Sequence, residues 1–92
     1  EVFMKAIITV VGSDKKGIIA KVSAVLADNN INIVDISQTI LSGNFVMMMM
    51  IDLSESKMKI DDLRGELETL GEKMGVNVNV MNERVFAEMH RI

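Results

Sequence analysis

The sequence predicts an α+β fold in which strands and helices follow one another in the order βαββαβ. Three observations support this prediction. Two stretches carry apolar residues at helical spacing, four carry β-branched or alternating apolar residues, and turn-forming residues separate them. The 92 residues suffice for one domain with a modest core.

The first strand and the first helix are predicted at residues 5–11 and 18–27. The strand is rich in β-branched residues and apolar on both faces, which is typical of a central strand. Asp14 is a candidate cap for the helix, and Asn29-Asn30 suits its exit because asparagine tolerates a left-handed conformation. The apolar stripe of this helix comprises Ile18, Val22, Val25 and Leu26.

A β-hairpin is predicted next, with strands at residues 32–41 and 45–53. Alternation in the first of these strands is broken at Ile33 and Val34, so a bulge is expected there. Residues 42–44, Ser-Gly-Asn, form the hairpin turn. The returning strand holds four consecutive methionines, 47–50, which point alternately to opposite faces. They are expected to fill the core or an interface, and not to bind copper.

Residues 60–74 are predicted to form an amphipathic helix. Asp61 and Asp62 in its first turn and Lys73 in its last match the helix dipole, and Gly75 is suited to end it. Residues 76–80 alternate Val and Asn as a fourth strand, and residues 85–92 are predicted to form a short C-terminal helix. The apolar stripe of the amphipathic helix comprises Ile60, Leu63, Leu67, Leu70 and Met74.

Together these elements form a ferredoxin-like plait, a four-stranded antiparallel sheet with two helices on one face. The apolar residues of the hairpin strands predict that the remaining sheet surface is covered, most simply in a dimer. Its geometry is left open between side-by-side, face-to-face and helix-to-helix pairing. Residues 1–92 are expected to form one domain, with residues 1–3 outside its folded part because Met4 resembles a natural initiator.

Composition argues against several classes of function. The chain lacks cysteine, which removes thiolate chemistry and fits a reducing compartment. A net charge of −3 and the absence of Trp and Tyr argue against nucleic-acid binding. No apolar stretch approaches the ~18 residues of a membrane span, and no signal-peptide pattern is seen, so a cytoplasmic location is expected.

Few residues are candidates for chemistry. The glycines of the loop at residues 12–17 let a ligand approach the backbone, although the loop taken alone favours a capped helix start with a tight turn over a ligand site. Asn32 offers donors and acceptors to an amino-acid head group, or serves only as a strand-entry residue. His90 has no second nitrogen or thiolate ligand beside it in sequence, so no metal site and no cofactor are predicted. The sequence shows no pairing of a nucleophile with a general base, so it does not indicate an enzyme.

Residues 10–37, VVGSDKKGIIAKVSAVLADNNINIVDIS, resemble the signature of the ACT domain. That signature is an Asp or Asn three residues before a Gly, an apolar helix start, and an Asn-Ile pair that opens the second strand. Residues 35–41 and 85–92 extend the resemblance to small stand-alone ACT proteins, which are similar to the ACT halves of glycine-cleavage-system repressor accessory proteins. The matching positions are Asp14, Gly17, Ile18, Asn32 and Ile33.

The resemblance implies a regulatory homodimer that binds a small molecule, expected to be an amino acid, between the 12–17 loop and the second strand of the neighbouring subunit. Asp14 and Asn32 would hydrogen-bond the head group, Gly17 would allow close backbone approach, and Ile18 and Ile33 would line the pocket. Lys16 stands where many family members have proline.

Three functions remain distinguishable at this point. Since the chain carries no catalytic or DNA-binding domain, the sensor is expected to act through a partner protein. The main alternative is a ligand-free interaction module with the same fold. An enzyme acting on an anionic substrate at Lys15 and Lys16 has little support, because no acid–base pair accompanies them.

Overall fold

The computed structural model describes residues 4–13 and 17–84, and these confirm the predicted order of elements. The predicted C-terminal helix and residues 1–3 lie outside the described residues. Neither helix of the described chain is long and apolar enough to cross a membrane. The elements are β1 (Lys5–Gly12), α1 (Ile18–Asp28), β2 (Asn32–Leu41), β3 (Asn44–Asp52), α2 (Ile60–Met74) and β4 (Asn77–Asn82).

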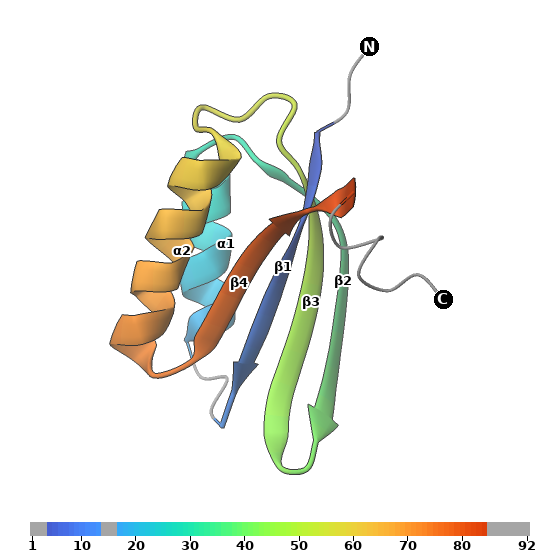
Figure 1. Ribbon diagram of the computed structural model, residues 1–92, viewed down its shortest axis with the longest axis vertical. Helices are drawn as coiled ribbons and strands as arrows, with labels where there is room; N and C mark the ends of the chain where they lie inside the picture. The colour runs from blue at the N-terminus through green and yellow to red at the C-terminus, as the bar shows by residue number, and fades with distance from the viewer. Residues whose placement is uncertain (1–3, 14–16, 85–92) are drawn as a thin grey trace.

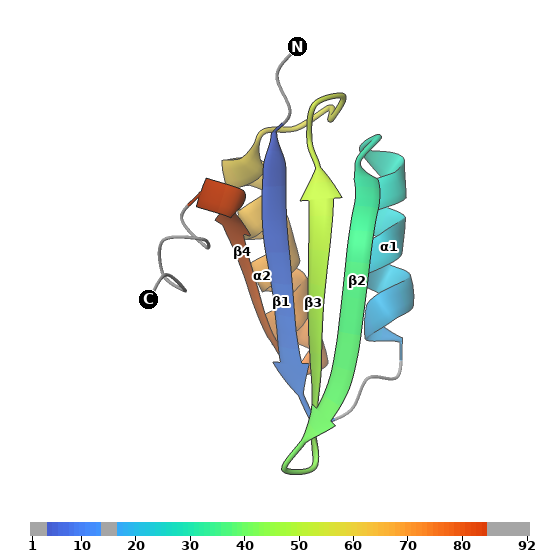
Figure 2. The same cartoon turned by 90° about the vertical axis from the view of Figure 1, so that its right-hand side faces the viewer.

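The four strands form one sheet in the order β2-β3-β1-β4, and every neighbouring pair is antiparallel. Strand β1 is therefore central, as its two-sided apolar sequence predicted. Both helices cover the same face of the sheet (Figures 1 and 2). This arrangement confirms the ferredoxin-like plait.

The core lies between the helices and the covered face of the sheet. Alternate residues of β1 and β3 point into it, so Met47 and Met49 are fully buried while Met48 between them is 38% exposed. This alternation confirms the methionine run as core filling on one face only. The helices contribute Ile18, Val22, Leu26, Leu63 and Leu67.

The predicted turns and the bulge are present. Ser42 and Gly43 both have positive φ angles, 54° and 79°, which close the β2–β3 hairpin through a two-residue turn. Asn30 takes the left-handed conformation expected after α1, with φ 61°. The register of β2 against β3 shifts between Ile33 and Asp35, where the sequence alternation failed.

The two helices begin and end differently from one another. The N-cap residue of α1 is Gly17, with φ 81°, and not Asp14, which lies outside the described residues. A left-handed residue at this position turns the chain sharply into the helix, and glycine adopts it without steric cost. Helix α2 ends as predicted at Gly75, whose φ is 72° and whose N–H points to the Glu72 carbonyl.

Helix α2 packs closely against β4 through a residue that the apolar pattern did not indicate. Gly71 is buried, and a Cβ atom there would lie 2.8 Å from Cγ2 of Val78 and 2.9 Å from the carbonyl oxygen of Val76. Leu70, expected in the buried stripe, is only half-buried. The helix is rotated so that its backbone, and not a large side chain, meets the strand.

Strand β2 is the least covered part of the fold. All ten of its residues are exposed. Its register places Ile36 and Ile40 opposite the buried Met49 and Phe45, on the helix side of the sheet, yet they are 40% and 63% exposed. Helix α1 lies behind β2, and β2 continues past the start of α1 toward the hairpin turn (Figure 2). The edge of the sheet is thus apolar and open within the described chain.

Two glycines of α2 provide a matched test of the α2–β4 contact. We expect Gly71→Ala to lower the free energy of unfolding by about 1–3 kcal/mol, because the added methyl group overpacks against β4. Gly65→Ala should raise it by about 0.5–1 kcal/mol, because no atom lies within 4 Å and alanine favours the helix. Urea unfolding of both variants measures the difference, and equal effects would contradict the close packing.

Candidate ligand-binding site

The end of β1 approaches β4 closely, which gives Gly12 a packing role. A Cβ atom on Gly12 would lie 2.5 Å from Cγ1 of Val76. Gly12 also pairs with Phe45 across the β1–β3 ladder. The absence of a side chain at this position is therefore required by the fold, independently of any ligand.

Gly17 presents its backbone at the surface where α1 begins. It is exposed, and its carbonyl accepts the first helical hydrogen bond, from the N–H of Lys21 at 3.0 Å. Within the described residues no side chain caps this helix, and its first turn has no acidic residue. Ile18 follows directly but is fully buried in the core, so in a single chain it contacts protein only.

Asn32 and Ile33 open β2, and the turn before them holds them in place. The N–H of Ile31 donates to the Leu26 carbonyl at 2.9 Å, and the N–H of Lys57 donates to the Asn29 carbonyl at 2.9 Å. Asn32 is exposed, and its carboxamide makes no hydrogen bond to the described residues. The backbone at Asn32 is therefore held in place, and among the described residues its carboxamide has no competing hydrogen-bond partner.

Asp52 lies opposite both Asn32 and Lys5 in the sheet, so this end of β2 carries a carboxylate. The Ser54 N–H donates to Oδ1 of Asp52 at 2.9 Å. This bond, with smaller effects from the Ser54 hydroxyl and from Lys5, lowers the pKa of Asp52 below its ordinary value, and partial desolvation opposes them. The carboxylate is therefore charged at neutral pH.

The structure brings the predicted site residues together in two pairs and separates the pairs. Gly17 and Ile18 lie near the end of β1, where Gly12 pairs with Phe45. Asn32 and Ile33 lie at the other end of the sheet, beside Asp52 (Figure 1). Helix α1 runs between the two pairs, and its 11 residues rise about 16 Å along the helix axis. One chain therefore cannot place both pairs on one small ligand, and Asp14 lies outside the described residues.

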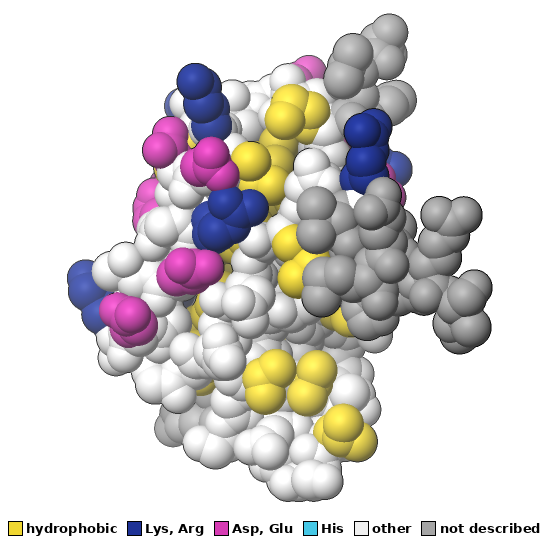
Figure 3. Space-filling model, viewed as in Figure 1, with side chains coloured by type: hydrophobic (Ala, Val, Ile, Leu, Met, Phe, Trp, Pro, Cys, Tyr) yellow, Lys and Arg dark blue, Asp and Glu magenta, His cyan; other side chains and the backbone are white. Residues whose placement is uncertain are grey.

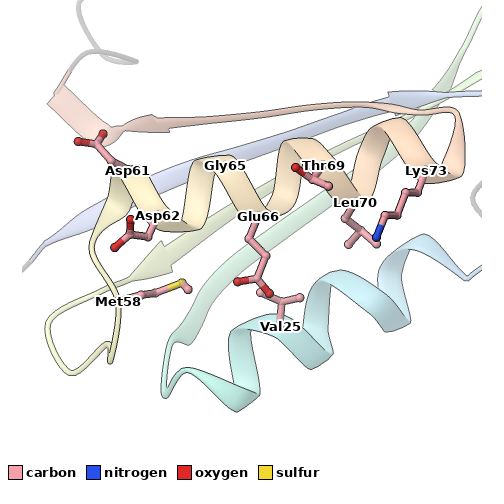
Figure 4. A pocket seen from close by; sticks show the side chains of 9 residues that line it. All are labelled: Val25, Met58, Asp61, Asp62, Gly65, Glu66, Thr69, Leu70 and Lys73. Atoms are coloured by element: carbon pink, nitrogen blue, oxygen red, sulfur yellow. The ribbon is translucent and has the colours of Figure 1, made fainter.

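The described surface also holds a groove of about 680 Å³ between α1 and α2, which sequence reasoning did not predict (Figure 4). None of the predicted ligand residues lines this groove. Periodicity gave no signal for it, because its apolar members belong to the same stripes as the core. Among residues 4–13 and 17–84, no three His, Cys, Asp or Glu side chains are grouped to hold a metal ion.

Comparison with known proteins agrees with this fold. The family model of the ACT domain matches residues 5–81. A UPF0237 protein of Clostridium acetobutylicum is 51% identical over 89 residues, which cover 97% of this chain and all of the relative. An ACT domain protein from Streptococcus pneumoniae superposes with a TM-score of 0.78 at 43% identity, over 97% of both chains.

A more distant structure has the same fold in a larger chain. A glycine cleavage system transcriptional repressor superposes with a TM-score of 0.73 at 23% identity, over 89% of this chain and 46% of the repressor. The fold and the family match place this chain in the class of small ACT-fold domains. The chain belongs to the ACT domain family, and its relatives of similar length are UPF0237 proteins.

The environment of Asp52 predicts a pH dependence of stability. Because its pKa is lower in the folded chain than in the unfolded one, its ionised form adds stability above the unfolded pKa. That contribution is lost as the pH falls through the folded pKa. Asp52→Asn should therefore flatten the acid limb of a stability–pH curve measured by urea unfolding.

Ser54→Ala serves as the control for this prediction. The largest cause of the lowered Asp52 pKa is the hydrogen bond from the Ser54 backbone N–H, which the substitution keeps. Ser54→Ala should keep most of the depression of the Asp52 pKa. An NMR titration that finds Asp52 of the unmodified protein at its ordinary value would contradict this assignment.

Proposed function

We propose that this ACT domain is a homodimeric sensor of an amino acid that acts on a partner protein and performs no catalysis itself. The observation that carries the proposal is the separation of Gly17 and Asn32 in a chain whose β2 edge is apolar and open. A second copy of the chain accounts for both facts at once. The absence of cysteine fits the reducing cytoplasm as its location.

Antiparallel pairing of two β2 edges about a two-fold axis supports this reading. Such pairing lays the start of one β2 strand beside the end of the other. Asn32 of the partner subunit would then lie near Leu41, and Figure 2 shows that α1 begins toward that end of β2. The two pairs of predicted residues would meet twice, once on each side of the axis.

The edge suits a dimer better than the open face of the sheet does. On the helix side of β2, Ile36 and Ile40 are exposed apolar residues without cover. The open face of the sheet carries both polar and apolar residues. One row across it, for example, consists of Ser37, Met48 and Thr9. Joining two β2 edges would satisfy unpaired backbone groups and bury Ile36 and Ile40 together.

The chemistry of such an interface fits an amino-acid head group. Backbone N–H groups at the start of α1 favour a carboxylate, because they lack intrahelical acceptors and lie at the positive end of the helix dipole. The carboxamide of Asn32 can donate and accept hydrogen bonds with the ammonium and carboxylate groups. Gly17 has no side chain, so the head group of a ligand can approach the backbone closely there.

A ligand-free interaction module is the second candidate, and a packing observation favours it at one position. Gly12 is explained by Val76 alone, without a ligand. In that case Asn32 would serve only to open β2. The two candidates differ in whether the protein responds to a small molecule.

A thermal-shift screen against the twenty amino acids tests the sensor. A ligand that binds only the folded state at 100 times its Kd adds about 2.7 kcal/mol and raises the melting temperature. We expect such a response to be lost in Asn32→Ala and kept in Asn79→Ala, which removes an exposed carboxamide from β4 at the opposite edge. No response to any amino acid would favour the ligand-free module.

Sedimentation of two lysine variants tests the dimer and its geometry. We expect Ile40→Lys to convert the dimer to a monomer, because a charge would enter the β2 edge, and to leave the folded monomer intact, because Ile40 is mostly exposed. Met48→Lys places the same charge on the open face and should leave the dimer unchanged. The reverse pattern would indicate face-to-face pairing.

A further inference from the structure

The groove between α1 and α2 has an apolar floor that the described chain leaves uncovered. Val25 of α1, Leu70 of α2 and Met58 of the preceding loop line it from three directions (Figure 4). All three are half-buried and pack against the core on their inner sides. The floor is therefore a continuation of the hydrophobic core that reaches the surface.

The walls of the groove are low enough to admit a helix. On α2 the groove is bordered by Gly65, where an added Cβ would meet no atom within 4 Å. On α1 only Val25 lines the groove. The missing side chain at Gly65 lets the backbone of a third helix approach the floor from the α2 side, as in helix-in-groove recognition.

The rim of the groove carries unbalanced negative charge. Asp61, Asp62 and Glu66 line it with a single cation, Lys73 (Figure 4). Acidic side chains also lie along α2 on the molecular surface (Figure 3). The rim therefore presents more anionic than cationic groups to an occupant.

Only one of the three rim carboxylates has a cationic partner in the described chain. Asp61 forms an ion pair with Arg64 at 2.6 Å, and Arg64 also donates to the Val80 carbonyl at 2.9 Å. Asp62 and Glu66 form no ion pair with a described residue, although they stand one helical turn apart and repel each other. These two carboxylates are therefore available to a basic ligand.

We propose that this groove docks a basic amphipathic helix of the partner protein. An apolar ridge of that helix, at positions i, i+3 or i+4 and i+7, would cover Val25, Met58 and Leu70. Lysine or arginine beside the ridge would pair with Asp62 and Glu66. The inference rests on the proposed function only in assuming that the domain acts on another protein.

Charge argues against a second copy of this chain as the occupant. The chain carries a net charge of −3, and α2 supplies acidic residues to the rim. Two such grooves placed against each other would bring like charges together at short range. A basic segment instead gains from both the apolar floor and the acidic rim.

A synthetic peptide serves as the probe. It is a fluorescent helix of about 15 residues with leucines on one face and lysines beside them, and a second peptide carries glutamate in place of lysine. Fluorescence anisotropy measures the Kd of each peptide for the protein. We expect the lysine peptide to bind, the glutamate peptide not to bind, and the Kd of the former to rise with ionic strength between about 0.05 and 0.5 M.

Two charge reversals on α2 give the decisive comparison. Glu66→Lys removes a rim carboxylate and should weaken binding of the lysine peptide by roughly tenfold or more. Glu68→Lys makes the same change of charge on an exposed residue outside the groove and should weaken it less than about threefold. Amide chemical shifts should move in α1 and α2 and not in β2.

Failure of this inference is distinguishable from failure of the proposed function. Glu66→Lys should keep any thermal response to an amino acid, and Asn32→Ala should keep peptide binding. Equal binding of both peptides, equal effects of the two reversals, or shifts confined to β2 would overturn the groove assignment. So would dimers that dissociate in Glu66→Lys, since the groove would then join two copies of the chain.

Discussion

The whole fold depends on the pairing of β1 with a neighbour on each side. Its register with β3 and with β4 fixes which residues point toward the helices, since a slip of one residue would turn every side chain to the other face. Ala6, Ile8 and Val10 thereby enter the core between the two helices. Within the described sheet β2 pairs with β3 alone, and its position follows from the same register.

Coverage of the sheet on one face alone accounts for the features that bear on function. The two helices do not cover the four strands completely, and Ile36 and Ile40 remain exposed on the helix side of β2. Between the helices the core reaches the surface at Val25 and Leu70. The edge of β2 and the groove are thus separate consequences of a small domain with more apolar surface than it can enclose.

The sequence predicted the fold well because its signals are local. Helix stripes, the bulge near Val34 and the turn at Ser42 and Gly43 all depend on neighbouring residues. Gly71 was missed because the need for a glycine comes from β4, which is distant in sequence. The site was predicted only as single residues. Gly17 and Asn32 flank α1, so the length of that helix separates them in one chain. The groove depends on helix packing, which no local pattern encodes.

The two edges of the sheet are unequal, and this limits how an assembly can grow. Strand β2 offers ten exposed residues, five of them apolar, whereas β4 has six residues and carries Asn77, Asn79 and Asn82. Head-to-tail addition of one copy to the next would have to match the long apolar edge to the short polar one. When the β2 edges of two copies pair with each other, only the short β4 edges remain at the ends of the joined sheet. The fold therefore discourages open-ended fibres of the kind that exposed sheet edges otherwise seed.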